Sequence, residues 1–124
     1  MKLSCIIIDD EPWASLLLVN FAKRVNDLIV LGTFDSTTDG FNYLKSINYE
    51  IDIVFLDVQL NQESSIMYLV ETGEDRLVDI VFTSAYKSSH FQNENVRYFD
   101  WLEKPIPYLS FEKVVERIIG SKSL

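Results

Sequence analysis

The sequence of 124 residues is poor in residue types that mark particular classes of protein, with one cysteine, four glycines and three prolines. A single cysteine cannot form a disulfide within the chain. Because Cys5 lies in an apolar run, we expect a buried thiol and a reducing, intracellular setting. No glycine-rich loop follows the first apolar run, which argues against a nucleotide-binding phosphate loop.

Basic residues are also few, since 11 lysines and arginines stand against 19 acidic residues and give a formal net charge of −8. This charge disfavours direct binding to nucleic acid or to an anionic lipid surface. The N-terminal apolar run at Leu3–Ile8 is too short for a signal sequence and far too short to cross a bilayer. We therefore expect a cytoplasmic protein that makes no contact with a membrane.

Hydrophobic residues are plentiful, at 48% of the chain. This content and length indicate one domain spanning residues 1–124. Five apolar segments have the pattern of buried strands, and they alternate with helical patterns, so we predict an α/β fold with a parallel sheet and right-handed crossovers. The predicted strands are Leu3–Ile8, Leu28–Phe34, Ile51–Val58, Leu77–Phe82 and Tyr98–Leu102. The predicted helices are Trp13–Val25, Thr38–Ile47, Ile66–Thr72, a short polar one within Tyr86–Val96, and Ser110–Ile119 ended by Gly120.

The strand predicted at Ile51–Val58 is the centre of this pattern, because it is apolar almost throughout and carries Asp57 where it ends. In open α/β sheets the functional crevice lies beyond the carboxyl ends of the strands. We therefore expect Asp57 to face a site and not the core.

Three other strands also end in polar chemistry. The first is followed by Asp9-Asp10-Glu11, and neighbouring carboxylates need solvent or a divalent cation. These acids, with Pro12, would equally suit the first turn of a helix, and both interpretations stay open. Ser84 follows the fourth strand, where its hydroxyl can donate into the crevice or cap the next helix. Lys104 follows the fifth strand.

Together these groups predict a particular chemistry. Carboxylates of one site can hold Mg²⁺, which prefers hard oxygen ligands. A carboxylate next to that ion can attack a phosphoryl group, while a lysine and a hydroxyl bind the remaining phosphoryl oxygens. The predicted reaction is formation of an aspartyl phosphate.

The chain resembles the receiver domains of two-component response regulators over essentially its whole length. The resemblance is carried by the acidic pair Asp9-Asp10, by Asp57 after Ile53–Leu56, by Ser84-Ala85 and by Lys104-Pro105. The segments at residues 82–86 and 99–106 look most like regulators with an output domain of the LytTR DNA-binding class. The resemblance implies a flavodoxin-like (βα)5 doubly wound fold with strand order 2-1-3-4-5.

The resemblance also implies roles for individual residues. Asp57 would be the phosphoacceptor, and Asp9 and Asp10 would hold Mg²⁺ together with Asp57 and the backbone carbonyl of Gln59. Lys104 would contact the phosphoryl group, and the Lys104–Pro105 peptide bond would be cis. Ser84 would be the switch hydroxyl and Trp101 the switch aromatic, which turns inward when the hydroxyl moves; a fixed core role for Trp101 is the alternative.

Some positions depart from the family pattern. The loop after the phosphoacceptor usually carries a proline and a glycine, yet here those positions hold Asn61 and Ser65, and Gln62 replaces another common glycine. The implied contact of Gln59 uses only its backbone, so these changes do not remove it. Arg97 replaces a glycine often found before the fifth strand.

The partners implied are a sensor histidine kinase and, in a homodimer, a second copy of the chain. DNA is expected to be contacted only through a C-terminal output domain that is missing here. A phosphorylation-independent interaction module with the same fold is the main alternative. A phosphohydrolase of the haloacid-dehalogenase type is disfavoured, because that family requires an acid where Gln59 stands.

Overall fold

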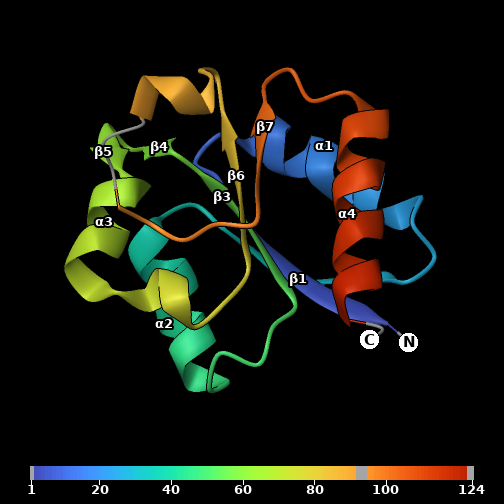
Figure 1. Ribbon diagram of the computed structural model, residues 1–124, viewed down its shortest axis with the longest axis horizontal. Coiled ribbons are helices and arrows are strands. Elements are labelled where there is room, and N and C mark those ends of the chain that lie inside the picture. The colour runs from blue at the N-terminus through green and yellow to red at the C-terminus, as the bar shows by residue number, and fades with distance from the viewer. Residues whose placement is uncertain (1, 92–94, 123–124) are drawn as a thin grey trace.

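The computed structural model of the chain describes residues 2–91 and 95–122. Its main sheet has five parallel strands in the order β2-β1-β3-β6-β7 (Figure 1). Counted among the strands of this sheet alone, that order is 2-1-3-4-5, which confirms the predicted flavodoxin-like α/β fold. The strands are β1 (Leu3–Ile8), β2 (Leu28–Phe34), β3 (Ile53–Asp57), β6 (Ile80–Ser84) and β7 (Asp100–Glu103).

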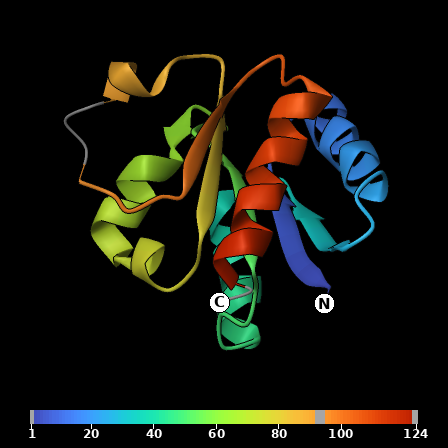
Figure 2. The ribbon, with the colours of Figure 1, turned by 45° about the vertical axis from the view of Figure 1, so that its right-hand side comes forward.

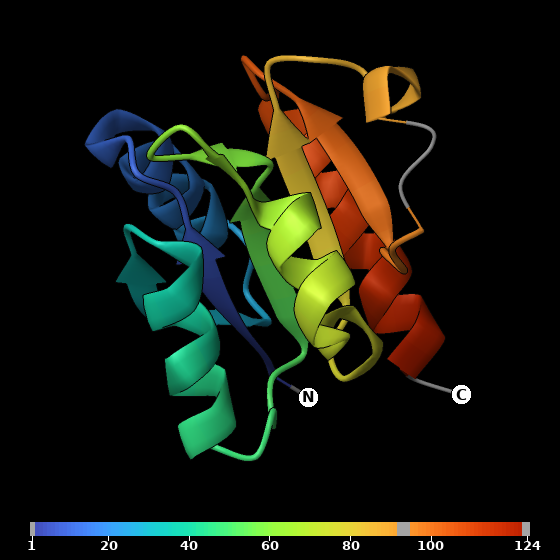
Figure 3. The same ribbon diagram turned by 90° about the vertical axis from the view of Figure 1, so that its left-hand side faces the viewer.

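Helices cover both faces of the sheet. Helices α1 (Pro12–Lys23) and α4 (Tyr108–Lys122) lie together on one face (Figure 2). Helices α2 (Thr37–Ser46) and α3 (Ser65–Thr72) lie on the other (Figure 3). In the described part of the chain, no helix combines the length and the apolar character that a membrane span requires.

The strands are apolar on both sides because each side faces a hydrophobic core. Along β1, Cys5 and Ile7 pack into the core beneath α1 and α4, whereas Ile6 and Ile8 pack into the core beneath α2 and α3. This two-sided burial explains the nearly continuous apolar runs in the sequence. Burial also raises the pKa of the Cys5 thiol to about 12, so the thiol is inert as predicted.

Local signals fix the ends of several helices. The Ser36 hydroxyl accepts a hydrogen bond from Asp39 N at 3.1 Å and caps α2, and the Ser64 hydroxyl caps α3 through Met67 N at 3.3 Å. Gly73 ends α3 with a φ of 74°, the left-handed conformation that is common for a glycine after a helix. At Gly40 the reason for glycine is space, because a Cβ atom there would collide with the side chain of Ile8.

Several predicted bounds differ from the structure by one or two residues, and three elements differ in a way that has a clear physical reason or in their type. The strand predicted from Leu77 begins at Ile80, because residues 74–76 form a 3-10 turn and Leu77 is exposed. The segment predicted as a polar helix holds only the short 3-10 helix η2 (Ser88–Phe91), and residues 92–94 lie outside the described part. Helix α4 was predicted to end at Gly120, but it continues to Lys122.

A small antiparallel hairpin replaces the loop predicted after Asp57. Its strands are β4 (Gln59–Leu60) and β5 (Glu63–Ser64), and Asn61 and Gln62 form the turn with φ values of 52° and 66°. Two positive φ values are the signature of the two-residue turn that best suits a hairpin. The hairpin therefore forms without the glycines that usually favour such a turn.

Strand β2 carries one residue more than its partner. Cys5 pairs with Val30 and Ile6 with Gly32, so Leu31 has no partner in β1. Because of this extra residue, each side chain after Leu31 points to the opposite face of the sheet from the one it would otherwise occupy. Accordingly, Val30 packs into the core beneath α1 and α4, and Phe34 into the opposite core.

Candidate functional site

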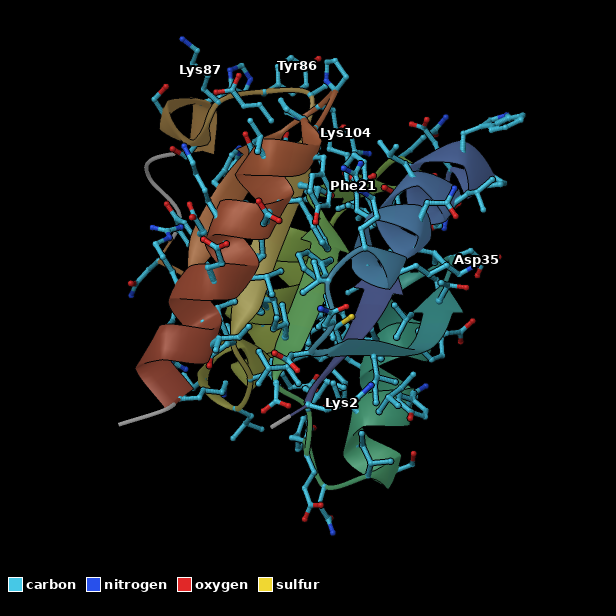
Figure 4. The ribbon with its side chains drawn as sticks, turned by 90° about the vertical axis from the view of Figure 1, so that its right-hand side faces the viewer. Lys2, Phe21, Asp35, Tyr86, Lys87 and Lys104 are labelled. Atoms are coloured by element: carbon cyan, nitrogen blue, oxygen red, sulfur yellow. The ribbon has the colours of Figure 1, made fainter. Side chains whose placement is uncertain are left out.

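The residues predicted for a site meet at the carboxyl ends of the parallel strands. Asp9 directly follows β1, Asp57 and Ser84 are the last residues of β3 and β6, and Lys104 directly follows β7. Figure 4 shows Lys104 near one end of the molecule, with Lys2, which precedes β1, near the other. The fold thus joins positions that are up to 95 residues apart in the chain.

Three carboxylates form the floor of the site. Asp9, Asp10 and Asp57 each offer an oxygen, and these oxygens all lie within 4.8 Å of one another. Asp9 and Asp57 are buried, with 3% and 5% of their surfaces exposed, while Asp10 is half-buried. Such a set of hard oxygen donors fits a divalent cation of the Mg²⁺ type, and Asp10 leaves it open to solvent.

Lys104 joins two of these acids. Its Nζ atom lies 2.9 Å from Oδ2 of Asp9 and 3.2 Å from Oδ2 of Asp57. Lys104 N donates to the Ser84 carbonyl at 2.7 Å, which holds the backbone of Lys104 in place. The Lys104–Pro105 peptide bond is cis, as the family resemblance implied. One positive charge is therefore shared between two buried negative charges.

The electrostatics of the site follow from this sharing. Burial, and next the charge of Asp9, raise the pKa of Asp57 to about 6, although Lys104 and the Gln59 N–H oppose the shift. Burial alone would lower the pKa of Lys104, but its hydrogen bonds and its attraction to Asp9 and Asp57 outweigh that effect and raise it. Lys104 thus stays charged, while Asp57 is an unusually basic carboxylate.

Backbone donors orient the two buried acids. Glu11 N donates to Oδ1 of Asp9 at 2.9 Å, and Gln59 N donates to Oδ1 of Asp57 at 3.3 Å. In both cases the donor lies two residues after the acid, in the segment that leaves the strand. Each acid is therefore held by its own loop on one oxygen and by Lys104 on the other.

The side chains of Ser84 and Trp101 each form a hydrogen bond with the backbone of Tyr86. The Ser84 hydroxyl, which is buried, accepts a hydrogen bond from Tyr86 N at 3.0 Å. The Trp101 indole Nε1 donates to the Tyr86 carbonyl at 2.8 Å, and its ring packs 5.4 Å from that of Phe82. Trp101 is partly buried, and its role as the switch aromatic stays a prediction.

Sequence reasoning missed two residues that contact the site. Asn61 N donates to Oδ2 of Asp10 at 2.8 Å, and the buried Ser65 hydroxyl donates to the Asp57 carbonyl at 2.7 Å. The only signal was that both positions depart from the family pattern. A departure from the family pattern marks a position as unusual, but it does not show which atoms the residue at that position contacts.

Comparison with curated proteins gives a consistent set of relatives. A response regulatory protein of Vibrio vulnificus is 33% identical over 122 residues, which cover 98% of this chain and 49% of the relative. The transcriptional regulatory protein BtsR of Escherichia coli and the sensory transduction protein LytT of Oceanobacillus iheyensis are each 26% identical, over 95% of this chain and 48% of their own length. The chain thus spans about half the length of the curated relatives it matches.

Solved structures agree on the fold. The signal receiver domain of a modulated diguanylate cyclase from Desulfovibrio desulfuricans superposes with a TM-score of 0.77, covering 99% of this chain and 98% of that one. At 19% identity this likeness establishes the fold alone. No family model matches the sequence.

Proposed function

We propose that the chain is a receiver domain of the response regulator class, and that residues 1–124 form one phospho-accepting unit with Asp57 as the phosphoacceptor. The observation that carries this proposal is the buried pair of Asp57 and Asp9 around Lys104. Two buried acids that share one half-buried lysine are costly to fold, and such clusters are often found at functional sites.

The donor would be the phosphohistidine of a sensor histidine kinase. A carboxylate oxygen of Asp57 attacks phosphorus, a P–O bond forms, and the P–N bond breaks with its electron pair leaving on the imidazole nitrogen, which then takes a proton. The Gln59 N–H and Lys104 each hold one oxygen of the Asp57 carboxylate, and this orientation supports its role as nucleophile. Lys104, already beside the attacking carboxylate, stays charged and balances the incoming phosphoryl oxygens.

Asp9, Asp10 and Asp57 would hold Mg²⁺, with the backbone carbonyl of Gln59 as a further ligand. The bound ion would offset negative charge on the attacking and transferred oxygens. The same site would support self-phosphorylation from small phosphodonors and slow self-dephosphorylation, in a signalling domain and not a turnover enzyme.

The switch would pass through Tyr86. If the Ser84 hydroxyl turns toward the phosphoryl group, it gives up the hydrogen bond from Tyr86 N. The carbonyl of Tyr86 holds the Trp101 indole, so a shift of this residue would release or move the ring. Phosphorylation would in this way reach the surface between η2 and β7.

The output of the switch is proposed to be transcription, because BtsR is named a transcriptional regulatory protein. Together with LytT, this relative supports the resemblance to the LytTR-type regulators. DNA would be bound by a C-terminal output domain and not by this acidic domain, and a homodimer would form through a second copy of the chain. A cytoplasmic location follows from the proposed partners.

The test is the intact mass of the metal-free protein after incubation with phosphoramidate, with and without Mg²⁺. We expect one added phosphoryl group that requires Mg²⁺ and is absent from the Asp57→Asn variant. Asp52→Asn is the matched control, since Asp52 directly precedes β3, at its other end, and it should be modified like wild type. No adduct on the wild-type protein would contradict the proposal and favour the phosphorylation-independent module.

A further inference from the structure

The turn of the β4–β5 hairpin is tied to two neighbouring loops through one residue. Asn61 N donates to Oδ2 of Asp10 at 2.8 Å, and the side-chain Nδ2 of Asn61 donates to the backbone carbonyl of Asp35 at 3.1 Å. Asp10 lies in the loop after β1 and Asp35 in the loop after β2. Asn61 thus connects the loops that follow three strands.

The backbone conformation of Asn61 is suited to this connection. Its φ of 52° lies in the left-handed region, which asparagine tolerates better than most residues. A proline, usual at this position in the resembled family, has a φ fixed near −65° and no N–H group. The departure from the family pattern therefore supplies the donor that Asp10 uses.

We propose that Asn61 is a positioning residue that orients Asp10 for the cation before the cation binds. This inference rests on the proposed function, in which Asp10 is a metal ligand. The Asn61 N–H donates to Oδ2 of Asp10 and restricts the rotation of the carboxylate, so that the acid is held in one orientation before the ion binds. Asp9 and Asp57 are already held by backbone donors and Lys104, so Asn61 completes the ordering of the three acids.

The benefit is preorganisation. Asp10 is the least buried of the three acids, and without a fixed partner its side chain would have to be ordered when the ion binds. Partners that orient metal ligands in this way change metal affinity by roughly 10- to 100-fold when they are removed. The Asn61–Asp35 hydrogen bond adds an anchor outside the site, which keeps the turn in register with Asp10.

The first experiment needs no metal and no phosphorylation. Amide hydrogen exchange of residue 61, followed by NMR in the metal-free protein, should be slow in wild type and accelerate in Asp10→Ala. The Ser65 amide donates to the Val58 carbonyl and serves as an internal control, so its protection should persist. Equal exchange of residue 61 in both proteins would overturn the hydrogen bond on which the proposal stands.

The second experiment measures Mg²⁺ affinity by calorimetric titration in three variants at this position. Asn61→Gly keeps the N–H and accepts the positive φ, so its Kd should stay within about threefold of wild type. Asn61→Val keeps the N–H but strains the turn. Asn61→Pro opposes the same φ and also removes the donor, and we expect its Kd to rise about tenfold above wild type and clearly above that of Asn61→Val.

The outcomes separate this inference from the proposed function. Absence of Mg²⁺ binding in wild type would contradict the proposed function itself. Normal binding by wild type with the same affinity in Asn61→Pro, or an equal loss in the proline and valine variants, would overturn the role of the Asn61 donor alone. A larger loss in the proline variant, with the glycine variant near wild type, supports it.

Discussion

At each end of the central sheet two acids share one lysine, but the surroundings of the two clusters differ. Asp10 adds a third acid at the carboxyl end, and Arg97 also pairs with Asp79 at the amino end. At the carboxyl end Lys104 joins Asp9 and Asp57, and at the amino end Lys122 joins Asp52 and Asp79. Strand β3 runs between Asp52, which precedes it, and Asp57, its last residue. Each cluster has two acids that share one lysine.

Burial distinguishes the two clusters. The side chains of Asp9 and Asp57 are 1% and 7% exposed, whereas those of Asp52 and Asp79 are 31% and 25% exposed. Solvent screens the charges at the amino end, so the ion pairs there serve only to hold the last turn of α4 against the sheet. At the carboxyl end the side chains of Asp9 and Asp57 are buried, so solvent screens their charges little. The raised pKa of Asp57 therefore comes first from its burial and not from the number of charges near it.

The largest expected difference between the two clusters is the loss of stability when the shared lysine is replaced. Lys104→Met leaves two buried acids without their cation, and we expect it to lower the free energy of unfolding by about 3 kcal/mol at pH 7 without metal. Lys122→Met should cost less than about 1 kcal/mol. Urea unfolding measures both values, and equal losses would show that burial does not separate the two ends.

Neutralising one acid at each end should stabilise the fold at the carboxyl end only. Because the pKa of Asp57 is raised to about 6 in the folded state, its charged form destabilises the fold at pH 7, and Asp57→Asn should stabilise the protein by about 2 kcal/mol. The gain should shrink as pH falls from 6 to 4, since the folded wild-type protein takes up the proton first.

Asp52→Asn provides the control for that measurement. It keeps an oxygen for the hydrogen bonds from Ser4 N and Oγ and loses only an exposed ion pair, so it should bring no gain. Urea unfolding of both variants at several pH values compares them. A stabilised Asp52→Asn, or an Asp57→Asn variant no more stable than wild type at pH 7, would contradict the electrostatic account.

The smallest expected difference between the two clusters is in how the stability cost of losing each lysine depends on salt. Raising ionic strength to about 1 M shortens the screening length to about 3 Å, so the cost of Lys122→Met should fall from roughly 0.5 kcal/mol to nearly zero. The cost of Lys104→Met should change little, since its partners are buried. Parallel urea titrations at low and high NaCl measure the effect, and a similar loss of both costs would mean that water reaches both ends equally.

The central part of this architecture could be predicted from the sequence because burial leaves a strong pattern. A strand buried on both faces is an apolar run, and an acid at its end is easily seen, as with Asp57. The strand order came from the family resemblance. The acids and Lys104 meet because parallel strands bring their carboxyl ends to one edge.

The remaining features depend on contacts that no local pattern encodes. Residues 59–65 are mostly polar and were predicted as a loop, yet Asn61 and Gln62 adopt the positive φ values of a hairpin turn. Gly120 was predicted to end α4, but Lys122 pairs with Asp52 and Asp79 and keeps the last turn helical. In each case a tertiary contact outweighs the local propensity.

The extra residue in β2 has a consequence for how the protein behaves in concentrated solution. Strand β2 lies at the edge of the sheet and contains no charged residue and no proline over Leu28–Phe34, a composition that invites pairing with another chain. The bulge at Leu31 interrupts the regular spacing of its free backbone groups. An incoming strand could pair on either side of Leu31 but not across it, so this edge resists growing into an intermolecular sheet.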